Sequence, residues 1–506
     1  MKTAVLVIGG GATGAGILWD LTLRGIDALL VEQRELAYGT TGRCHGLLHS
    51  GGRYVVRDRS VARECYRENQ ILRRVAAAAV EETGGFFVHL EGDAPVYAER
   101  WAEAATSAGI PFREIDLSEA HRLEPLLSRN VRRVFLVPDA SIDPFDLVMI
   151  NAQGAIRRGA KVLTGVRVEK LLVEGRRVRG AVLKDIETGE IYSVNAEVVV
   201  NAAGPWAGQV AATAGSHLQL AYGKGTLLVY SQRLCDHVIN RLRPPGDGDI
   251  LVPAKTVSLL GTTDLPALTP DNPEPTGDEI KALLDRGEEL IPGLAGRRVL
   301  RSFAGVRPIY DPGEGAGRGA SRGFAVVDHE EADGIHGFCS VVGGKLTTYR
   351  LMAEQAADLV AAKLGVSERC RTKDTCLPAL TTLAPVPPDS IEGKSAPLVC
   401  ECELLDKETF LQAVRRLARL TPEALLRGAR LAHGPCQGTT CIYRGALLLY
   451  REKLLSYAGC REFMRRAFRA RQRRGEALQG DQARQLELAR GIYLQNLQLG
   501  GGDDEL

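Results

Sequence analysis

The sequence predicts an α/β protein with a Rossmann-like nucleotide-binding domain, an interleaved second domain with a mixed sheet, and a small, mostly helical C-terminal domain. Three observations lead to this prediction. The chain begins with an apolar strand, a glycine-rich turn and an apolar helix. Strand-rich stretches recur at 160–200 and 225–264. Four cysteines gather near the C-terminus, after a proline-rich stretch.

The first 32 residues predict one βαβ unit. Residues 4–8 (Ala-Val-Leu-Val-Ile) form a short apolar run, as expected of a buried parallel strand. Residues 12–24 carry apolar side chains at helical spacing, and residues 28–31 predict a second strand that ends at Glu32. A strand, helix and strand in this order build the first half of a nucleotide-binding sheet.

The turn of this unit has the spacing Gly9-x-Gly11-x-x-Gly14. Gly9 permits a tight turn, Gly11 lets the backbone approach a pyrophosphate, and Gly14 lets the helix pack closely on the strand. The helix N-terminus attracts phosphate, and Glu32 can accept hydrogen bonds from ribose hydroxyls. This fingerprint predicts a dinucleotide, and by itself it fits FAD and NAD equally.

Length, charge and cysteine usage limit the class of protein. A chain of 506 residues predicts two or three domains, and a net charge of +2 gives no electrostatic reason to expect nucleic acid as a partner. Eleven cysteines with one Cx4C and one CxC spacing do not resemble a secreted disulfide scaffold. Lys2 before an apolar run could begin a signal peptide, but the glycines stand where a phosphate-binding turn needs them. We therefore expect a cytoplasmic protein.

Composition changes along the chain predict its domain boundaries. Residues 366–397 are proline-rich and predict a linker, and a basic stretch lies between Arg461 and Arg474. The predicted segments are 1–75, 145–225 and 320–365 for the nucleotide-binding domain, 76–144 and 226–319 for the substrate domain, 398–450 for the cysteine domain, and 451–506 for a helical basic tail.

The four C-terminal cysteines predict a cofactor site. Cys400 and Cys402 form one pair, and Cys436 and Cys441 form the other. Thiolates in two tight pairs suit an iron–sulfur cluster, whereas four cysteines can also hold one tetrahedral zinc ion. The single residue between Cys400 and Cys402 is a shorter spacing than that of the usual zinc knuckle. A nucleotide cofactor and a one-electron centre together favour an electron-transfer flavoenzyme.

Two further features predict a substrate site. Residues 40–54 are rich in glycine and histidine, as in a loop that lies against a flat ring, although such a stretch can also be a plain surface loop. Arg307, Arg322 and Lys345 each stand in a glycine-containing turn. Arginine side chains match phosphate oxygens bidentately, so this set predicts an anionic substrate.

These motifs resemble known flavoproteins. Residues 201–206 (Asn-Ala-Ala-Gly-Pro-Trp), after an apolar strand, resemble the second FAD-contacting strand of the D-amino-acid-oxidase-like superfamily, which favours FAD. Residues 49–54 (His-Ser-Gly-Gly-Arg-Tyr), 305–308 (Gly-Val-Arg-Pro) and 343–350 (Gly-Gly-Lys-Leu-Thr-Thr-Tyr-Arg) resemble FAD-dependent glycerol-3-phosphate dehydrogenases. The cysteine domain narrows the resemblance to the large subunits of the anaerobic enzymes, which end in a BFD-like 2Fe–2S domain.

The resemblance implies roles for individual residues. His49 is implied near the flavin, as a candidate base, and Arg307 near the reacting carbon. Four residues would surround the substrate: Arg53, Tyr54, Arg322 and Lys345. Seven would line FAD: Gly9, Gly11, Gly14, Glu32, Thr41, Gly204 and Gly344. Four would hold the 2Fe–2S cluster: Cys400, Cys402, Cys436 and Cys441.

The implied reaction is oxidation of glycerol 3-phosphate to dihydroxyacetone phosphate by hydride transfer to the flavin. Electrons would then pass through the cluster and partner subunits to quinone, which implies a peripheral position on the cytoplasmic face of the cell membrane. Two departures stand out. The second cysteine pair is spaced Cx4C where BFD-like domains often have CxxC, and Cys44 stands where the flavin-side loop usually has asparagine.

Two other functions remain open at this point. One is an amino-acid or 2-hydroxy-acid dehydrogenase of the same superfamily, which the extra basic residues disfavour. The other is a flavin and iron–sulfur electron-relay protein without a substrate of its own, which His49, Arg53, Arg307 and Lys345 disfavour.

Overall fold

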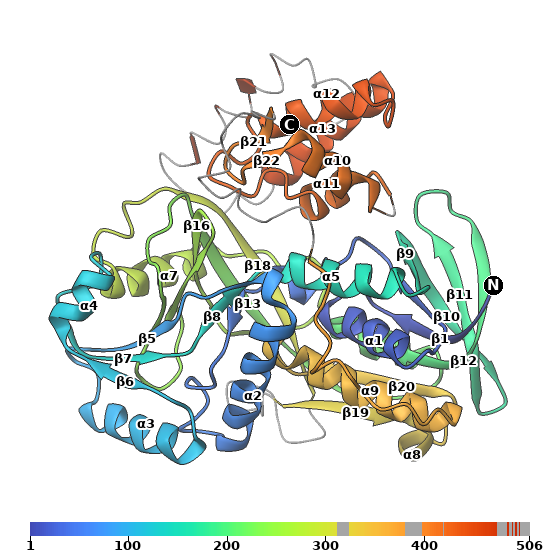
Figure 1. Cartoon of the computed structure of the whole chain (residues 1–506), viewed down its shortest axis with the longest axis horizontal. Helices are drawn as coiled ribbons and strands as arrows, with labels where there is room; N and C mark the ends of the chain where they lie inside the picture. The colour runs from blue at the N-terminus through green and yellow to red at the C-terminus, as the bar shows by residue number, and fades with distance from the viewer. Residues whose placement is uncertain are drawn as a thin grey trace.

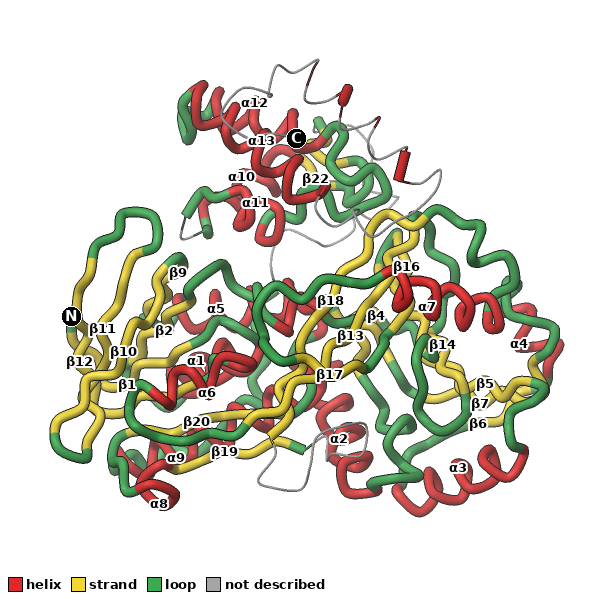
Figure 2. Tube along the Cα trace, turned by 180° about the vertical axis from the view of Figure 1, so that it is seen from behind, coloured by secondary structure: helices red, strands yellow, loops and turns green. Residues whose placement is uncertain are grey.

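The computed structural model describes residues 1–310, 323–379, 397–417 and 419–472, together with residues 483–484, 488, 491–492 and 495. Two sheets with their helices lie side by side, and a smaller C-terminal module stands above both of them (Figures 1 and 2). We use the name C-terminal module for the described residues 397–417 and 419–472. The α/β fold predicted from the sequence is confirmed.

The first sheet has eight strands and contains the predicted βαβ unit, β1 (Lys2–Ile8), α1 (Ala12–Leu23) and β2 (Ala28–Glu32). The strand order is β10-β11-β12-β1-β2-β9, and β20 extends the sheet by pairing with both β12 and β19. The remaining strands are β9 (Lys161–Thr164), β10 (Val166–Glu174), β11 (Arg177–Asp185), β12 (Ile191–Asn201), β19 (Phe324–Asp328) and β20 (Phe338–Gly343). The carboxyl ends of the parallel strands β1, β2 and β12 therefore meet at one edge, where α/β proteins bind ligands.

Helix α1 is buried on nearly all sides, between α5 (Pro144–Ile156) and α9 (Tyr349–Leu364). Such close packing leaves no room for a side chain at Gly14, where an added Cβ would lie 1.9 Å from the Gly9 carbonyl oxygen. A Cβ at Gly16 would lie 3.0 Å from the Tyr349 ring. Gly14 thus lets α1 pack closely on the β1–α1 turn, and Gly16 lets it pack closely on α9.

The second sheet has nine strands, in the order β17-β13-β16-β15-β14-β5-β7-β6, with β18 paired to β13. Its strands are β5 (Gly85–Leu90), β6 (Arg113–Ile115), β7 (Val131–Val137), β13 (Leu220–Tyr230), β14 (Val238–Arg241), β15 (Ile250–Ala254), β16 (Val257–Gly261), β17 (Leu265–Ala267) and β18 (Val299–Tyr310). Helices α3 (Pro95–Ala108), α4 (Leu117–Leu123) and α7 (Gly277–Leu290) pack on this sheet. Its strands come from two separate stretches of the chain, so the two domains are interleaved.

Helix α2 (Arg59–Val75) ends just before the alanine run at residues 76–79. After the short turn η2 (Ala77–Ala79), strand β4 (Val80–Glu81) pairs with β8 (Ala140–Ile142), which also pairs with β3 (Leu47–Leu48). Backbone pairing with distant strands therefore overrides the helical propensity of the alanine run.

The C-terminal module has a hydrophobic core of its own. It contains β21 (Leu398–Cys400), β22 (Leu405–Asp406), α10 (Lys407–Arg415), α11 (Pro422–Gly428), α12 (Cys441–Arg451) and α13 (Tyr457–Gln472). Phe410, Leu425 and Ile442 are fully buried in that core, and Phe463 of α13 packs among them. The compact unit thus continues beyond residue 450, where we expected a separate basic tail, because the apolar face of α13 completes this core.

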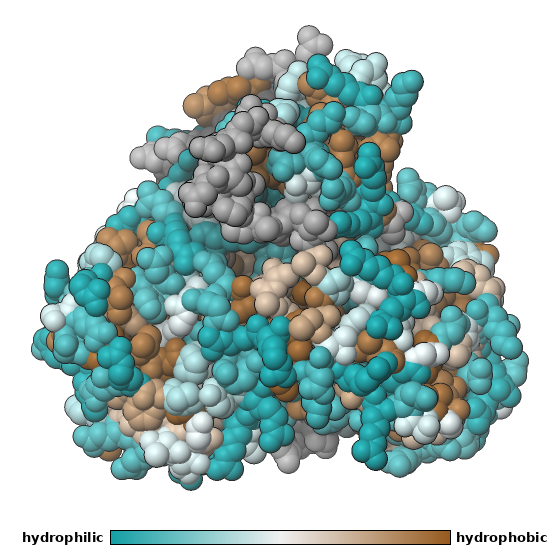
Figure 3. All heavy atoms as spheres, in the orientation of Figure 1, coloured by the Kyte–Doolittle hydropathy of each residue, from teal (hydrophilic) through white to brown (hydrophobic). Residues whose placement is uncertain are grey.

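The predicted linker begins as an ordered segment. The Leu377 amide donates to the Val75 carbonyl at 2.7 Å, and Arg371 donates to the Leu23 carbonyl at 2.8 Å. Residues 366–379 therefore pack along the nucleotide-binding domain, and residues 380–396 lie outside the described residues. Among the helices described here, none is both long and apolar enough to cross a bilayer. On the face shown in Figure 3, apolar side chains are interspersed with hydrophilic ones.

Candidate active site

A cavity of about 880 Å³ is lined by residues of both sheets. Its walls come from the β1–α1 turn, the loop at η1 (Thr40–Arg43), the ends of β12 and β20, and β18. A volume in this range suits a cofactor or drug-sized ligand. The glycine-rich turn lies in one wall, and histidine and cationic side chains lie in the others.

The backbone of the β1–α1 turn explains the glycines of the fingerprint. Gly9 has a φ of 110°, and a Cβ there would lie 2.5 Å from the Ala202 carbonyl oxygen. Gly11 precedes α1 as its N-cap residue and has no side chain to cap the helix. Gly9 and Gly11 line the cavity, whereas Gly14 lies behind them, against Gly9. The start of α1 thus offers N–H groups and a positive dipole end to an anion.

Glu32 stands at the end of β2 in the cavity wall. Its carboxylate accepts a hydrogen bond from the Gly10 amide at 2.7 Å and another from the Arg34 amide at 2.8 Å. Burial raises the pKa of Glu32, and these two amide donors oppose that effect. The carboxylate is therefore held in one orientation at the place where the fingerprint needs an acidic group.

The other residues predicted to hold the nucleotide lie in the same cavity. Thr41 accepts a hydrogen bond from the Ala12 amide at 3.1 Å, which joins η1 to the first turn of α1. Gly204 has a φ of 56° and Gly344 a φ of 77°, both in the left-handed region that favours glycine. A Cβ at Gly344 would lie 2.4 Å from the Met352 sulfur.

The predicted substrate residues His49, Arg53, Tyr54, Arg307 and Lys345 line the same cavity. The rings of His49 and Tyr54 meet edge to face, with centroids 5.3 Å apart, and Lys345 Nζ lies 5.1 Å from the Tyr54 ring centroid. Arg322 lies outside the described residues. Segments separated by some 250 to 300 positions in the sequence thus meet at one place.

His49 is a buried, neutral imidazole. Burial is the main cause that lowers the pKa of His49 well below its ordinary value, and the positive charges of Arg53 and Lys345 act in the same direction, as does His45. Its backbone amide donates to Thr347 Oγ1 at 3.1 Å, which ties the loop to the turn after Lys345. A neutral imidazole can accept a proton, so the site contains a potential general base.

Arg307 lies within strand β18 and not in the turn that the sequence predicted, because its backbone pairs with β13. Its guanidinium is held from three sides. Its Nη1 donates to Asp264 Oδ1 at 3.0 Å, and its Nη2 donates to the Thr263 carbonyl at 3.2 Å and to the Thr262 hydroxyl. The neighbouring strand β13 leaves space for it, since a Cβ at Gly225 would lie only 2.4 Å from Nη2. The guanidinium is therefore fixed before any ligand enters.

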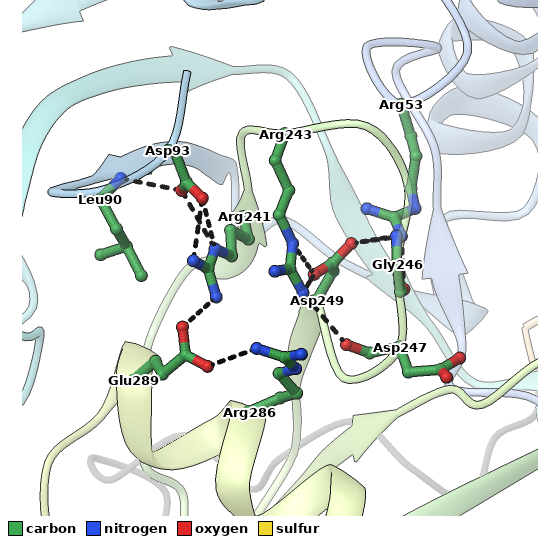
Figure 4. A network of polar contacts seen from close by, with 10 residues as sticks. All are labelled: Arg53, Leu90, Asp93, Arg241, Arg243, Gly246, Asp247, Asp249, Arg286 and Glu289. Carbon is green, nitrogen blue, oxygen red and sulfur yellow. Dashed lines mark hydrogen bonds and ion pairs between the residues drawn. The ribbon is translucent and has the colours of Figure 1, made fainter. Parts of the chain in front are cut away.

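Arg53 is held by a residue that sequence analysis missed. Its Nη2 donates to Asp249 Oδ2 at 3.1 Å and to the Gly246 carbonyl at 3.4 Å (Figure 4). Asp249 also accepts hydrogen bonds from Arg243 and from the Gly246 amide. No motif marks Asp249, because its partner Arg53 lies 196 positions earlier in the chain.

His45 is a second residue that sequence analysis missed. Its ring centroid lies 6.0 Å from that of His49, and its Nδ1 accepts a hydrogen bond from the Leu47 amide at 3.2 Å. Burial, followed by the charges of Arg307 and Arg53, lowers the pKa of His45 to about 3. The spacing of two histidines within one glycine-rich loop was the available signal.

The four C-terminal cysteines are neighbours in the fold. Cys441 shares hydrogen bonds with both Cys400 and Cys436, and Cys402 lies against Cys436. The hydrogen bond from Cys441 lowers the pKa of Cys436 to about 5, and also lowers the pKa of Cys400. Burial raises the pKa of Cys402 to about 11. The pKa of Cys441 is also raised, because its thiol donates hydrogen bonds to Cys400 and Cys436.

Backbone amides surround these sulfurs. The Ala432 amide donates to Cys441 Sγ at 3.2 Å, Glu403 donates to Cys400, and Gly438 and Thr439 donate to Cys436. Donors of this kind stabilise thiolate ligands. Within the described residues, no group of three or more His, Cys, Asp or Glu side chains is arranged to hold a metal ion. The sulfur contacts run from Cys400 to Cys441, from Cys441 to Cys436 and from Cys436 to Cys402, so the four thiols form one continuous group.

Comparison with known proteins agrees with this geometry. Residues 4–350 match the family model described as FAD dependent oxidoreductase. The chain is 40% identical over 521 residues to the A subunit of the anaerobic glycerol-3-phosphate dehydrogenase of Escherichia coli, covering 97% of this chain and 96% of that protein. It is also 40% identical over 481 residues to the A1 subunit of the Haloferax volcanii enzyme, covering 88% of this chain and 82% of that protein.

Solved structures share the fold. The glycerol-3-phosphate dehydrogenase of Bacillus halodurans, complexed with FAD, superposes with a TM-score of 0.67 at 23% identity, covering 95% of this chain and 96% of that one. The L-proline dehydrogenase of P. horikoshii superposes with a TM-score of 0.59 at 21% identity, covering 75% of this chain and 96% of that one. The chain therefore belongs to the FAD-dependent oxidoreductase family and, within it, to the A subunits of the anaerobic glycerol-3-phosphate dehydrogenases.

Proposed function

We propose that this enzyme oxidises sn-glycerol 3-phosphate to dihydroxyacetone phosphate with FAD as the hydride acceptor. The observation that carries the proposal is one cavity that combines a dinucleotide turn with a neutral imidazole and three cationic side chains. Gly9 and Gly11 lie at the turn, and His49 lies among Arg53, Arg307 and Lys345. The relatives named glycerol-3-phosphate dehydrogenase supply the substrate class.

The cavity residues fit FAD. The N–H groups at the start of α1 would bind the pyrophosphate, and Glu32 would accept hydrogen bonds from the ribose. Thr41, Gly204 and Gly344 would border the rest of the cofactor, where the two glycines leave the backbone open to close approach. When bound, FAD supplies an acceptor for two electrons and a proton in the form of a hydride.

Cationic side chains would bind and orient the substrate phosphate. Arg53 is preorganised by Asp249, and Lys345 is held over the Tyr54 ring. Guanidinium groups bind phosphate bidentately, and an ammonium group adds a point charge. We include Arg322 in this set from its sequence motif alone. The substrate's phosphate would thus be anchored while its C2 carbon faces the flavin side of the cavity.

The remaining residues serve the chemical step. His49, neutral because it is buried, would accept the proton of the C2 hydroxyl while the C2–H bond breaks and its electron pair leaves as hydride. Arg307, held by Asp264 and Thr263, would stabilise the negative charge that develops on the C2 oxygen. The substrate thus loses two electrons and two protons, and the proton on His49 passes to water.

We propose that the four cysteines hold a 2Fe–2S cluster. Four adjoining thiols supply the protein sulfurs that a 2Fe–2S cluster needs, and the surrounding amides suit anionic sulfur. Electrons from the reduced flavin would then leave singly through this cluster to partner subunits and on to quinone. The relatives are named as one subunit of their enzymes, which supports an assembly of several subunits. Such partners would place this protein on the cytoplasmic face of the cell membrane.

The test is the visible spectrum of anaerobically purified protein before and after addition of glycerol 3-phosphate. We expect the flavin bands and a broad brown absorbance both to bleach. Bleaching of the flavin alone would support the dehydrogenase activity and contradict electron transfer through the cluster. A flavin that stays oxidised with glycerol 3-phosphate would overturn the substrate assignment, and a panel of amino acids and 2-hydroxy acids would then test the rival dehydrogenases.

A further inference from the structure

Arg430 of the C-terminal module is buried where the module meets the rest of the protein. Only 5% of the residue is exposed, and its backbone has a φ of 54°, which is unusual for a side chain of this size. Its Nε donates to Glu403 Oε2 at 2.8 Å, and its Nη1 donates to the Asp143 carboxylate and lies 3.6 Å from Asp146. A buried cation with a strained backbone persists only where its surroundings hold it.

The acidic partners of Arg430 come from two different domains. Asp143 is the N-cap of α5 and also accepts hydrogen bonds from the first turn of that helix, while Asp146 stands within that turn. Glu403 directly follows Cys402 in the hairpin that carries the first cysteine pair. One guanidinium therefore joins the cysteine hairpin to the start of α5.

A third domain reaches the same group of charges. Lys255, in the turn between β15 and β16, places Nζ 3.5 Å from Asp146 and 3.8 Å from Glu403. The carboxylates are thus shared between two cations. Because burying these charges is costly unless each is paired, the group favours one docked arrangement of the module over others.

The start of α5 lies against the loop at η1 (Thr40–Arg43), which we call the flavin-side loop because it borders the proposed FAD site. The Phe145 ring fills the space beside Gly42 of η1, where an added Cβ would lie 2.8 Å from that ring. On the other side, the ring packs edge to face against His433, with centroids 5.5 Å apart. His433 stands three residues before Cys436. Phe145 therefore contacts both the C-terminal module and the loop at η1.

We propose that Arg430 is the positioning residue that seats the C-terminal module on the flavin-side loop. Seating would keep the cysteine site of one chain close to the flavin of the same chain. Each glycerol 3-phosphate oxidised would give two electrons, which would leave the reduced flavin one at a time for the cysteine-held cluster. This inference rests on the proposed function for its redox part and on the ionic contacts for its docking part.

The experiment compares three full-length variants with the unaltered enzyme. Arg430→Met removes the cation and keeps an unbranched apolar stem, and Arg430→Lys keeps the charge without the planar fork. Arg466→Met is the matched control, because Arg466 is half exposed and pairs with Glu423 inside the same module. Hydrogen exchange is measured on segments 143–149 and 398–405, and rapid mixing with glycerol 3-phosphate follows the flavin and cluster absorbances separately.

Arg430→Met should speed exchange in both segments and leave the rate of flavin reduction unchanged. It should slow cluster reduction by about tenfold or more, the scale seen for groups that support a metal site. Arg430→Lys should fall between Arg430→Met and the control, and it serves as the test if Arg430→Met does not fold. Unchanged exchange in both segments, or cluster reduction at the control rate, would overturn the proposal. If glycerol 3-phosphate fails to reduce the flavin of the unaltered enzyme, the proposed function fails while the exchange data still decide the docking role.

Discussion

Asp249 accepts a hydrogen bond from Arg53 Nη2 at 3.1 Å with a side chain that is completely buried. The same carboxylate lies 2.7 Å from Arg243 Nη2 and accepts from the Gly246 amide at 2.6 Å (Figure 4). One buried anion thus orients a cationic cavity residue and also holds the loop at Pro244 and Gly246, which lines the same cavity. Because Arg53 needs no reorganisation to meet an anion, its position is set before the substrate binds.

Asp249→Asn should therefore weaken substrate binding more than catalysis. Loss of a charge-assisted hydrogen bond costs about 1.5–3 kcal/mol, so KM for glycerol 3-phosphate should rise about tenfold or more while kcat changes less. Steady-state kinetics with an artificial electron acceptor measure both quantities. Arg243→Gln is the control, since it removes the other cation from Asp249 and leaves Arg53 in place. An unchanged KM in Asp249→Asn would contradict the positioning role.

Arg307 should act mainly on turnover. Arg307→Ala should lower kcat by about 10²–10³-fold, which is the effect of losing one preorganised donor to a developing oxyanion. The FAD content should not change. Arg307→Lys keeps the charge but cannot reproduce the bonds to both Asp264 and Thr263, so it should recover only part of the loss. Turnover and flavin absorbance are measured on the same preparations. A variant Arg307→Ala with full turnover would exclude the electrostatic role.

The pH dependence should reflect the low pKa of His49. Burial favours the neutral ring, so the base stays unprotonated as the pH falls through 6.5, the ordinary value for histidine. The profile of kcat/KM for the unaltered enzyme should then show no acid limb near pH 6.5, and activity should fall only at a clearly lower pH. His49→Gln should lose turnover at every pH. An acid limb near pH 6.5 in the unaltered enzyme would contradict the low pKa of His49.

Loss of one of the four cysteines should remove the iron–sulfur cluster and leave the FAD bound. Cys436→Ser replaces the thiol whose pKa is about 5, the one best prepared to be a thiolate ligand. Iron should fall from about two per chain, the content of a 2Fe–2S cluster, to near zero, and the flavin bands should remain. Cys460→Ser is the control, because Cys460 is buried in the module core and its sulfur contacts the Ala446 carbonyl. Zinc rather than iron in the unaltered protein would support the alternative metal.

Much of the fold could be predicted because its signals are local. The βαβ unit appears in apolar periodicity, and Gly9, Gly11 and Gly14 appear as fixed spacings within one turn. The actual packing explains two of them, since an added Cβ would collide with Ala202 at Gly9 and with Gly9 at Gly14. The end of α2 could not be predicted, because strand pairing with β8 decides it and no local signal marks it.

By itself the sequence determined the strand–turn–helix unit, the glycines that its turn requires and the two cysteine pairs, since all of these depend on neighbours a few residues apart. Only the tertiary structure decided that His49 and Lys345 line one cavity, that Asp249 holds Arg53, and that Arg430 joins the cysteine hairpin to α5. Arg53 and Asp249 are 196 positions apart, and Arg430 and Asp143 are 287 positions apart. Which charges become buried together depends on how the two sheets and the module pack, and residue spacing does not encode that packing.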